Sequence, residues 1–301
     1  MNFILTLVAP EDHKLPNDAI TAACNLFGKS SAPNWLSKGR ACDLLFTQCD
    51  LATLPNTRDK LATHLTEFSI DWALQADKNR RKSVLVSDMD STIIGQECID
   101  EIADFAGVRD QVSNITERAM AGALDFDIAL IERVRLLKGM SENAINQVMS
   151  ERIHLNLGAK TLLATMRHHG AYTMLVSGGF TFCASRIAQR AGFDDFNANQ
   201  LIFSGTNLTG KVQKPILGRE AKLGFLCAAC NRRGVALDQS IGIGDGANDI
   251  ALVKNAGIGI AYKAKQKLTE NADACITHTD LTTALFFQGY NENEFIHETK
   301  V

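Results

Sequence analysis

Several features that would place this chain of 301 residues in a special class of protein are missing from it. It has no run of about 18 apolar residues, so the sequence predicts no membrane-spanning helix. Lysine and arginine (31) do not exceed aspartate and glutamate (34), and the net charge of −3 argues against non-specific binding to nucleic acid. Internal repeats and low-complexity segments are absent. The composition is that of a soluble globular protein with one large domain or two to three smaller ones.

The N-terminus lacks the pattern of a secretory signal. Its short apolar run at 1–10 follows no basic region and leads into polar residues from Glu11 rather than a cleavage site. The eight cysteines are scattered, and we expect them to be reduced and buried. Cys227 and Cys230 form a C-x-x-C pair inside a helical pattern, where core packing is favoured over a redox or metal role. Together these features predict a cytoplasmic protein.

The first 75 residues read as strand, helix, strand, strand, helix and strand. The predicted elements are, in order, 3–8, 17–27, 35–36, 42–47, 57–67 and 70–74. This βαββαβ order is ferredoxin-like and resembles the small regulatory (ACT-like) domains that precede some metabolic enzymes. Binding of a regulatory ligand and simple packing on the rest of the chain are both open. The polar, mostly basic run at 77–82 is expected to be a solvated linker.

After the linker, strands and helices alternate, which predicts a parallel sheet with helices on both faces. The predicted strands are 84–87, 172–176, 241–244, 258–261 and 274–277, and the helices between them are 160–167, 182–190, 220–231 and 249–256. Four short helices at 97–106, 112–121, 126–137 and 142–149 interrupt this pattern. They are expected to form an insertion that folds over the active site. Residues 199–212 suggest a β-hairpin excursion rather than a core strand.

Two carboxylates, Asp88 and Asp90, follow the first strand of this sheet in the run Val-Leu-Val-Ser-Asp-Met-Asp-Ser-Thr at 84–92. Open α/β sheets bind ligands at the carboxyl ends of their strands. Asp88 could attack a phosphoryl group there, while Asp90 protonates the leaving oxygen and later activates water. Taken alone, a D-x-D pattern is also typical of an acidic turn.

Three further elements fit the same chemistry. Ser177 and Gly178 begin a Ser-Gly-Gly turn whose hydroxyl and backbone N–H groups can cradle phosphate oxygens. Lys222 can offset charge on a transferring group, although lysines on helices usually lie on solvated faces. Asp245 and Asp249, in Gly-Asp-Gly-Ala-Asn-Asp, follow another apolar strand and could hold Mg²⁺ directly or through water.

The order Asp-x-Asp, Ser, Lys, Gly-Asp-x-x-x-Asp resembles that of the haloacid dehalogenase (HAD) superfamily of phosphatases. Within it, residues 81–285 resemble the phosphoserine phosphatases. The matching residues are Asp88 to Thr92, Glu97, 119–126, 133–137, 177–180 and 244–249. The resemblance implies an α/β fold with a Rossmann-like parallel HAD core at 77–95 and 157–301, a helical cap at 96–156 and an N-terminal ACT-like α+β domain at 1–76.

The resemblance also implies roles that the residues alone leave open. Glu97 would meet the substrate ammonium, Arg133 would pair with the substrate carboxylate, and Phe126 would close over the substrate. A helix-opening glutamate, a surface arginine and a core phenylalanine are the respective structural alternatives. The other substrate-binding residues implied are Ser177, Gly178, Lys222 and Asn248.

A metal site is implied by the same resemblance. Asp88, the backbone carbonyl of Asp90 and Asp245 would bind Mg²⁺, with Asp249 in support behind them. The predicted function is Mg²⁺-dependent hydrolysis of O-phospho-L-serine to L-serine and phosphate through an aspartyl-phosphate, as the last step of serine biosynthesis.

Two alternatives to this function stay open. One is a different capped HAD phosphatase or phosphotransferase that acts on another small phosphomonoester. The other is an amino-acid-binding regulatory protein that acts through residues 1–76. The expected partner is the small-molecule substrate, with no nucleic acid and no membrane, and an amino-acid effector and a homodimer are left open.

Overall fold

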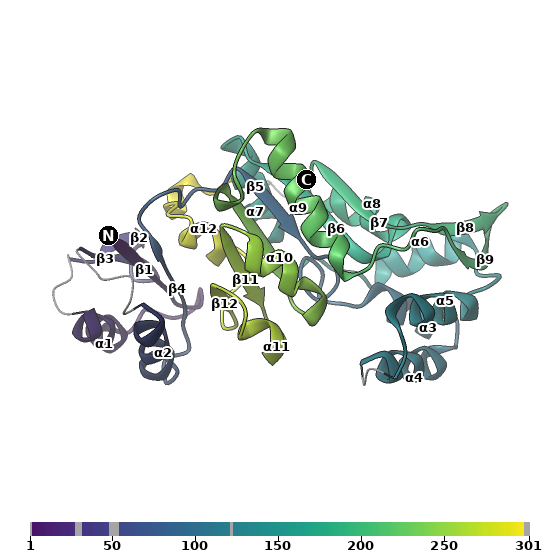
Figure 1. The fold of residues 1–301 in the computed structure, drawn as a ribbon, viewed down its shortest axis with the longest axis horizontal. Helices are drawn as coiled ribbons and strands as arrows, with labels where there is room; N and C mark the ends of the chain where they lie inside the picture. The colour runs from purple at the N-terminus through teal and green to yellow at the C-terminus, as the bar shows by residue number, and fades with distance from the viewer. Residues whose placement is uncertain (1, 28–31, 48–53, 121–122, 298–301) are drawn as a thin grey trace.

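One sheet of ten strands runs through the molecule in the computed structural model, which describes residues 2–27, 32–47, 54–120 and 123–297. Its strand order is β2-β3-β1-β4-β12-β11-β10-β5-β6-β7, and β8 and β9 form a separate hairpin. Figure 1 shows an N-terminal unit at one end, the core in the middle and the cap at the other end. The α/β class predicted from the sequence is confirmed.

The core sheet is parallel and contains β5 (Val84–Ser87), β6 (Tyr172–Phe180), β7 (Asp195–Asn199), β10 (Ser240–Gly244), β11 (Ile258–Tyr262) and β12 (Ala274–Ile276). Successive side chains of a strand point to opposite faces, so β5 is apolar on both. Val84 and Val86 pack with Leu226 and Leu252, whereas Leu85 belongs to the cluster on the other face with Leu162. The carboxyl ends of these strands therefore project from a rigid, fully covered sheet.

Helices cover both faces of this core, as the alternating pattern predicts. The helices are α7 (Ala159–His168), α8 (Thr181–Ala191), α9 (Arg219–Arg233), α10 (Ile250–Asn255), α11 (Gln266–Thr269) and α12 (Thr283–Phe287), with 3₁₀ turns at Leu237–Gln239, Ala247–Asp249 and Glu292–Glu294. Residues of α9 and α10 pack on one face, and residues of α7, α8 and α12 on the other. No helix within the described ranges is long and apolar enough to cross a bilayer.

The N-terminal unit has the βαββαβ order predicted for it. It comprises β1 (Phe3–Val8), α1 (Asn17–Phe27), β2 (Asn34–Ser37), β3 (Ala41–Phe46), α2 (Leu54–Leu65) and β4 (Asp71–Ala76). Its strands are antiparallel, and residues of both helices join one apolar cluster with the sheet. The ACT-like relationship remains a prediction. The sequence did not predict that β4 pairs antiparallel with β12, Ala73 opposite Ala274, and so continues the core sheet.

The prediction of a solvated linker at 77–82 is wrong for two of its cations. Arg80 donates to both carboxylate oxygens of Asp43, at 2.6 and 3.0 Å, and to Thr6 Oγ1 at 3.0 Å. Lys82 is buried and donates to the carbonyl of Asp238 at 2.7 Å. Arg80 and Lys82 therefore bind polar partners inside the protein, whereas Asp77, Lys78, Asn79 and Arg81 are exposed, as the prediction required.

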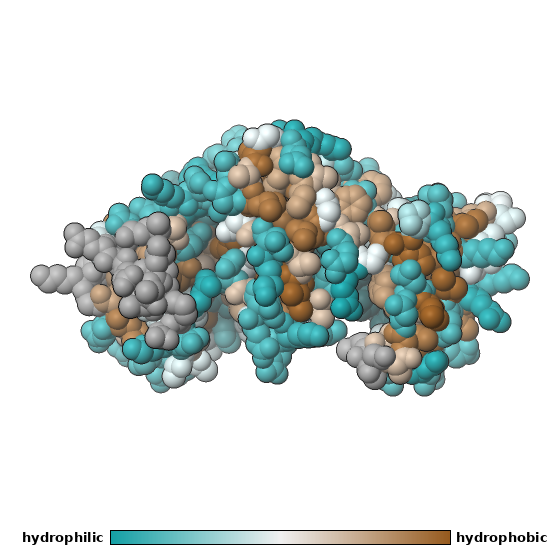
Figure 2. Space-filling model, in the orientation of Figure 1, coloured by the Kyte–Doolittle hydropathy of each residue, from teal (hydrophilic) through white to brown (hydrophobic). Residues whose placement is uncertain are grey.

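The cap contains α3 (Cys98–Phe105), α4 (Arg109–Met120), α5 (Phe126–Leu136) and α6 (Glu142–Glu151). Asp125 and Ser141 cap α5 and α6 by accepting from the backbone N–H groups of Asp127 and Ala144. The two crossings between core and cap run side by side, because Ile94 and Leu155 form an antiparallel bridge. Figure 2 shows the cap as a lobe with hydrophobic residues on the visible face. Ile128 of α5 is 49% exposed.

The predicted hairpin consists of β8 (Leu201–Ser204) and β9 (Asn207–Val212), and it supports the cap from a distant part of the chain. Gly139 N–H donates to the carbonyl of Leu208 at 2.8 Å, and Leu208 N–H donates to Met140 at 2.9 Å. The loop between α5 and α6 therefore pairs with β9 through backbone hydrogen bonds, as a neighbouring strand would. The hairpin and the cap therefore form one lobe.

The cysteines behave largely as the sequence predicts. Cys42, Cys98, Cys183 and Cys230 are buried, while Cys24, Cys227 and Cys275 are partly buried. Cys230 packs in the apolar cluster beneath α9, which agrees with a core role for the C-x-x-C pair. Cys49 lies outside the described residues.

Candidate active site

Asp88 is the first residue after β5, and it is held in place from both sides. Its N–H donates to the carbonyl of Ile243 on the neighbouring strand at 2.9 Å, which continues the sheet pairing. Its own carboxylate oxygen Oδ1 accepts from the Met89 N–H at 2.8 Å. Lys222 Nζ lies 2.8 Å from the same oxygen. A nearly buried carboxylate is thus fixed at the sheet edge with a cation beside it.

Asp90 lies in a tight loop whose next residue, Ser91, has φ +54°. A non-glycine residue in this left-handed region is strained, and such strain often occurs at functional sites. The Asp90 carboxylate accepts from the Cys98 N–H at 2.8 Å and from Ser177 Oγ at 3.3 Å. Burial, reinforced by the charge of Glu97, raises the pKa of Asp90 to about 7. A carboxyl with this pKa can both hold and release a proton near neutral pH.

Ser177 and Gly178 lie where β6 bulges away from β7. Pairing is regular up to Val176 opposite Asn197 and resumes at Phe180 opposite Asn199. Between these pairs β6 advances by four residues and β7 by two, so the intervening residues of β6 loop out of the pairing as a bulge within the strand. Ser177 Oγ also accepts from the Gly179 N–H at 2.8 Å. The bulge thus places the Ser177 hydroxyl beside Asp90 and brings the Gly178 backbone to the edge of the sheet where the other site residues lie.

Lys222 comes from the first turn of α9 and is 3% exposed. Its ammonium bridges two carboxylates, Asp88 and Asp249. Burial alone lowers the pKa of Lys222, but these two carboxylates reverse the shift and leave the pKa above its ordinary value. The structure therefore keeps a buried positive charge beside Asp88, where sequence reasoning alone allowed a solvated lysine.

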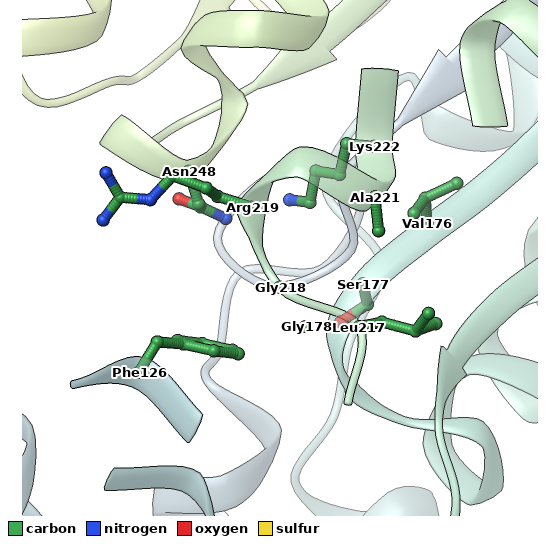
Figure 3. Close-up of a pocket in the computed structure, with 10 residues that line it drawn as sticks. All are labelled: Phe126, Val176, Ser177, Gly178, Leu217, Gly218, Arg219, Ala221, Lys222 and Asn248. Carbon is green, nitrogen blue, oxygen red and sulfur yellow. The ribbon is translucent and has the colours of Figure 1, made fainter. Parts of the chain in front are cut away.

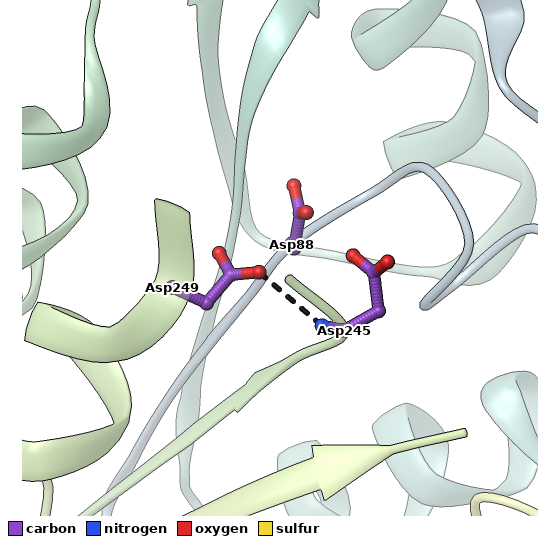
Figure 4. Close-up of side chains that lie close together, drawn as sticks. All are labelled: Asp88, Asp245 and Asp249. Carbon is purple, nitrogen blue, oxygen red and sulfur yellow. Dashed lines mark hydrogen bonds between the residues drawn. The ribbon is translucent and has the colours of Figure 1, made fainter. Parts of the chain in front are cut away.

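The acidic cluster consists of Asp88, Asp245 and Asp249, whose nearest carboxylate oxygens lie within 4.8 Å of one another (Figure 4). Asp249 is fully engaged: one oxygen accepts from Lys222 and the other from the backbone N–H groups of Asp245 and Gly246. The Asp245 carboxylate accepts no hydrogen bond from the residues that the structure describes. Asp88 and Asp245 are therefore the carboxylates available to a cation, and Asp249 supports them from behind.

The electrostatics of the cluster also suit a cation. Burial and the charge of Asp249 raise the pKa of Asp88 well above its usual value, against the opposing effect of Lys222. Burial and Asp249 also raise the pKa of Asp245 to about 6. Three carboxylates facing one ammonium form an oxygen-rich, negatively charged donor set of the kind that binds Mg²⁺. These residues fit a divalent metal ion, and the identity of that ion is taken up below.

A pocket that is open to solvent adjoins the cluster, with Lys222 in its lining (Figure 3). Its lining includes four predicted substrate-binding residues of the core, Ser177, Gly178, Lys222 and Asn248, together with Phe126 of the cap. The Phe126 ring stands over Gly178 so closely that a Cβ on this glycine would lie 3.3 Å from the ring edge. Cap and core thus enclose the pocket together.

Glu97 and Arg133 lie near this pocket but do not line it. Glu97 is exposed at the start of α3 and accepts from Ser91 Oγ at 2.8 Å. Arg133 is half-buried on α5 and donates to Thr116 Oγ1 at 3.4 Å. Burial lowers the pKa of Arg133, and the carboxylates of Asp100, Glu97 and Asp90 oppose that shift. Glu97 thus contacts the segment after Asp90, whereas the hydrogen bonds of Arg133 lie within the cap.

Among the polar residues of the site, sequence reasoning missed Arg219 and Asn199. Arg219, at the start of α9, lines the pocket and extends beside Asn248 (Figure 3). Asn199, at the end of β7, is buried and hydrogen-bonds with two of the loops that line the pocket. The strand that ends at Asn199, β7, was not among the predicted strands, so the sequence pattern gave no signal for this residue.

Residues 85–254 match the family model described as haloacid dehalogenase-like hydrolase. The chain is 32% identical to a phosphoserine phosphatase of Saccharomyces cerevisiae, with 97% of each chain covered. It is 37% identical to a phosphoserine phosphatase of Archaeoglobus fulgidus over 74% of this chain, but the match spans only 65% of that protein.

Among solved structures, a HAD family hydrolase from Salmonella enterica serovar Typhi has the same arrangement. Its TM-score is 0.85 at 27% identity, with 97% of this chain and 99% of that chain covered. The similarity therefore extends over the N-terminal unit as well as over the core and cap.

Proposed function

Because the chain belongs to the haloacid dehalogenase-like hydrolases, we propose that it hydrolyses O-phospho-L-serine to L-serine and phosphate. The observation that carries the phosphoryl-transfer part of this proposal is the contact between Asp88 and Lys222 at the end of β5, with Ser177 and Asp90 hydrogen-bonded beside it. A carboxylate, a cation and an acid of raised pKa meet there next to an open pocket. The substrate part is supported by the two relatives, which are phosphoserine phosphatases.

In the first step, a carboxylate oxygen of Asp88 bonds to phosphorus while the bond from phosphorus to the seryl oxygen breaks. Asp90 gives its proton to that oxygen, because an alkoxide is a poor leaving group. The product on the protein is an aspartyl-phosphate. The pKa of Asp90, about 7, suits this donation because the group still carries a proton near neutral pH.

In the second step, Asp90 takes a proton from water, which attacks phosphorus and releases phosphate from Asp88. The same carboxyl thus acts as an acid and then as a base, which avoids a separate base in the site. Lys222 and the hydroxyl of Ser177 bind the phosphoryl oxygens and offset their charge in both steps. The Phe126 ring at the pocket mouth limits the access of bulk water.

Asp88, Asp245 and the backbone carbonyl of Asp90 would hold Mg²⁺, with Asp249 fixed behind them by Lys222 and two backbone N–H groups. When bound, the ion would supply positive charge opposite the phosphoryl group. The protein's contribution is to keep these oxygens close together despite their mutual repulsion. The hydrogen bonds that Asp249 accepts from Lys222 and from two backbone N–H groups help to hold them in place.

Substrate choice falls to the cap. Arg133 pairs with the carboxylate of phosphoserine and Glu97 with its ammonium, each from an element next to the catalytic loop. The apolar ring of Phe126 covers the short seryl chain. A small pocket with one acid, one base and an aromatic cover suits a small amino-acid ester.

The test is release of phosphate from L-phosphoserine, with and without Mg²⁺, beside a panel of phosphomonoesters that lack the amino or carboxylate group. Preference for L-phosphoserine by a large factor in kcat/KM is the expected result. Equal rates across the panel would leave a HAD phosphatase but reject the amino-acid substrate. If phosphoserine is the substrate, release of serine makes the enzyme the last step of serine biosynthesis.

A further inference from the structure

Asn199 occupies an unusual position among the polar residues of the core. It is the last residue of β7, it is 2% exposed, and it lies opposite Phe180, where β6 resumes regular pairing after its bulge. Buried side-chain amides must find hydrogen-bond partners, or their desolvation costs stability. The partners described for the Asn199 side chain are all backbone groups of two loops that line the pocket. One is the bulge of β6, and the other is the segment just before α9.

The carboxamide of Asn199 contacts two such loops at once. Its Nδ2 donates to the carbonyl of Gly178 at 2.9 Å and to the carbonyl of Leu217 at 3.4 Å. Its Oδ1 accepts from the Leu217 N–H at 2.7 Å. Where the bulge removes the regular strand pairing of Gly178, the amide provides a substitute. A two-sided contact of this kind fixes the spacing between the loops.

Both loops lead directly to groups that bind phosphoryl oxygens in the proposed reaction. Ser177 precedes Gly178 on one loop. On the other, Leu217 and Gly218 lead into α9, whose first turn carries Lys222. The hydroxyl and the ammonium come from segments far apart in the sequence, and among the contacts described Asn199 is the side chain that hydrogen-bonds to both loops.

We propose that Asn199 is a positioning residue that holds Ser177 and Gly178 at the correct distance from Lys222 for phosphoryl transfer. The inference rests on the proposed phosphoryl transfer, but not on the identity of the alcohol that leaves. Asn199 touches neither the acidic cluster nor the cap in the contacts described. Its loss therefore affects the grip on the phosphoryl group and not the recognition of the amino acid.

The test compares Asn199→Ser and Asn199→Asp with matched changes at Asn197. Asn197 lies on the same strand and is half-buried, and within the described residues its side chain makes one hydrogen bond, a long one of 3.6 Å to the sulfur of Met174. Asn199→Ser removes the two-sided contact, while Asn199→Asp keeps the shape and the acceptor but loses the donor to Gly178. Melting curves establish that each variant is folded.

The readouts are kcat, KM and inhibition by inorganic phosphate. We expect kcat to fall by roughly tenfold to a hundredfold in both Asn199 variants, because a misplacement of about 1 Å can cost that much. The inhibition constant for phosphate should rise by about fivefold or more, the equivalent of one hydrogen bond. Both Asn197 variants should stay within about twofold of the unaltered enzyme, a difference of less than 0.5 kcal/mol by the ~1.4 kcal/mol per decade conversion.

A folded Asn199 variant whose kcat and phosphate inhibition are unchanged would overturn the inference. Failure of both Asn199 variants to fold, with both Asn197 variants folded, would overturn it too, because Asn199 would then hold β7 rather than the loops. The same measurements with p-nitrophenyl phosphate separate this inference from the substrate. Equal losses on both esters support the positioning role even if phosphoserine proves not to be the preferred substrate.

Discussion

At the scale of single residues, the proposed chemistry depends first on the oxygen that Asp88 presents to phosphorus. Asp88→Asn keeps the shape of the side chain and the possibility of contact with Met89, but an amide is not an effective nucleophile. We expect turnover to fall by roughly a thousandfold or more. Steady-state phosphate release measures the loss, and a melting curve checks that the variant is folded. Appreciable turnover in a folded Asp88→Asn variant would rule out the covalent route.

Arg133 provides the residue-scale test of substrate choice. An unpaired substrate carboxylate in an enclosed site typically costs about 2–5 kcal/mol. Arg133→Ala should therefore lower kcat/KM for phosphoserine by roughly 30-fold or more, at about 1.4 kcal/mol per decade. The neighbouring Arg135 is exposed on the same helix, so Arg135→Ala is the matched control.

Esters without a carboxylate supply the second control for Arg133. Arg133→Ala should leave the hydrolysis of p-nitrophenyl phosphate nearly unchanged, because that ester has no group to pair with the guanidinium. Equal losses on both substrates would mean that Arg133 supports the cap or the chemistry. In that case its assignment to the amino-acid carboxylate would be withdrawn.

Gly244 shows how closely the strand end approaches the acidic cluster. A Cβ at this position would lie 2.3 Å from Cγ of Asp249, a distance that no packing adjustment of a buried carboxylate can absorb. Gly244→Ala should destabilise the protein by about 1–3 kcal/mol through overpacking. Gly224→Ala is the control: this glycine is exposed within α9 with open space around it, and alanine there should stabilise by up to about 1 kcal/mol. Urea unfolding of both variants measures the contrast, and a neutral Gly244→Ala would contradict it.

Residue patterns predicted much of this site because its chemistry sits at the ends of strands. Asp88, Ser177 and Asp245 each follow an apolar run, and parallel strands bring such ends to one edge. Lys222 gained its role in the sequence only from resemblance, since its partners lie on other elements. Asn199 could not be found from a pattern, because its importance depends on a bulge in the strand beside it.

At the scale of secondary-structure elements, the segment between β4 and β5 is held by charge. Arg80 forms a buried ion pair with Asp43, whereas its neighbour Arg81 is 46% exposed and pairs with Glu294. Removing one partner of a buried pair leaves an unpaired charge and typically costs about 3–5 kcal/mol. A surface pair contributes about 0–1 kcal/mol.

Arg80→Ala and Arg81→Ala therefore form a matched pair of variants in adjacent positions. We expect the free energy of unfolding to fall by about 3–5 kcal/mol in the first and by less than about 1 kcal/mol in the second. Denaturant unfolding measures both. Equal and small effects would show that Arg80 behaves as the solvated linker residue that its sequence context suggests.

Elements were easier to predict than the contacts between them. The alternation of apolar residues gave β1 to β4 and their two helices in the right order. It could not predict the pairing of β4 with β12. Each of them is the edge strand of its own predicted sheet, and the residues of an edge strand do not specify which strand will pair with it. The burial of Arg80 was not predictable either, because its partner Asp43 lies on β3, far from Arg80 in the sequence.

At the scale of the whole molecule, the proposed metal ion should act on stability as well as activity. EDTA should abolish phosphate release, and Mg²⁺ should restore it. Because a ligand that binds the folded state stabilises it by mass action, Mg²⁺ at about 100 times its Kd should add about 2.7 kcal/mol to the free energy of unfolding. The melting temperature should therefore rise with Mg²⁺ even in a variant without turnover, such as Asp88→Asn, if Asp245 still binds the ion.

Calcium separates binding from chemistry in the same experiment. Ca²⁺ takes more oxygen ligands at longer distances than Mg²⁺ and accepts irregular geometry. It should therefore raise the melting temperature but support little turnover, because it would occupy the Asp88 oxygen needed for attack. Full activity in Ca²⁺ alone would contradict the proposed arrangement of Asp88 and Asp245.

The joined sheet has a mechanical consequence. Because β4 is hydrogen-bonded to β12, the N-terminal unit and the core share one continuous sheet. They cannot rotate against each other as rigid bodies without breaking that strand pairing. The cap, by contrast, joins the core through two adjacent crossings at Ile94 and Leu155 and is also bridged to the β8–β9 hairpin between Ser141 and Asn207. A ligand bound to the N-terminal unit would therefore have to act on the core through the flexibility of the shared sheet, and not through a rotation of one unit against the other.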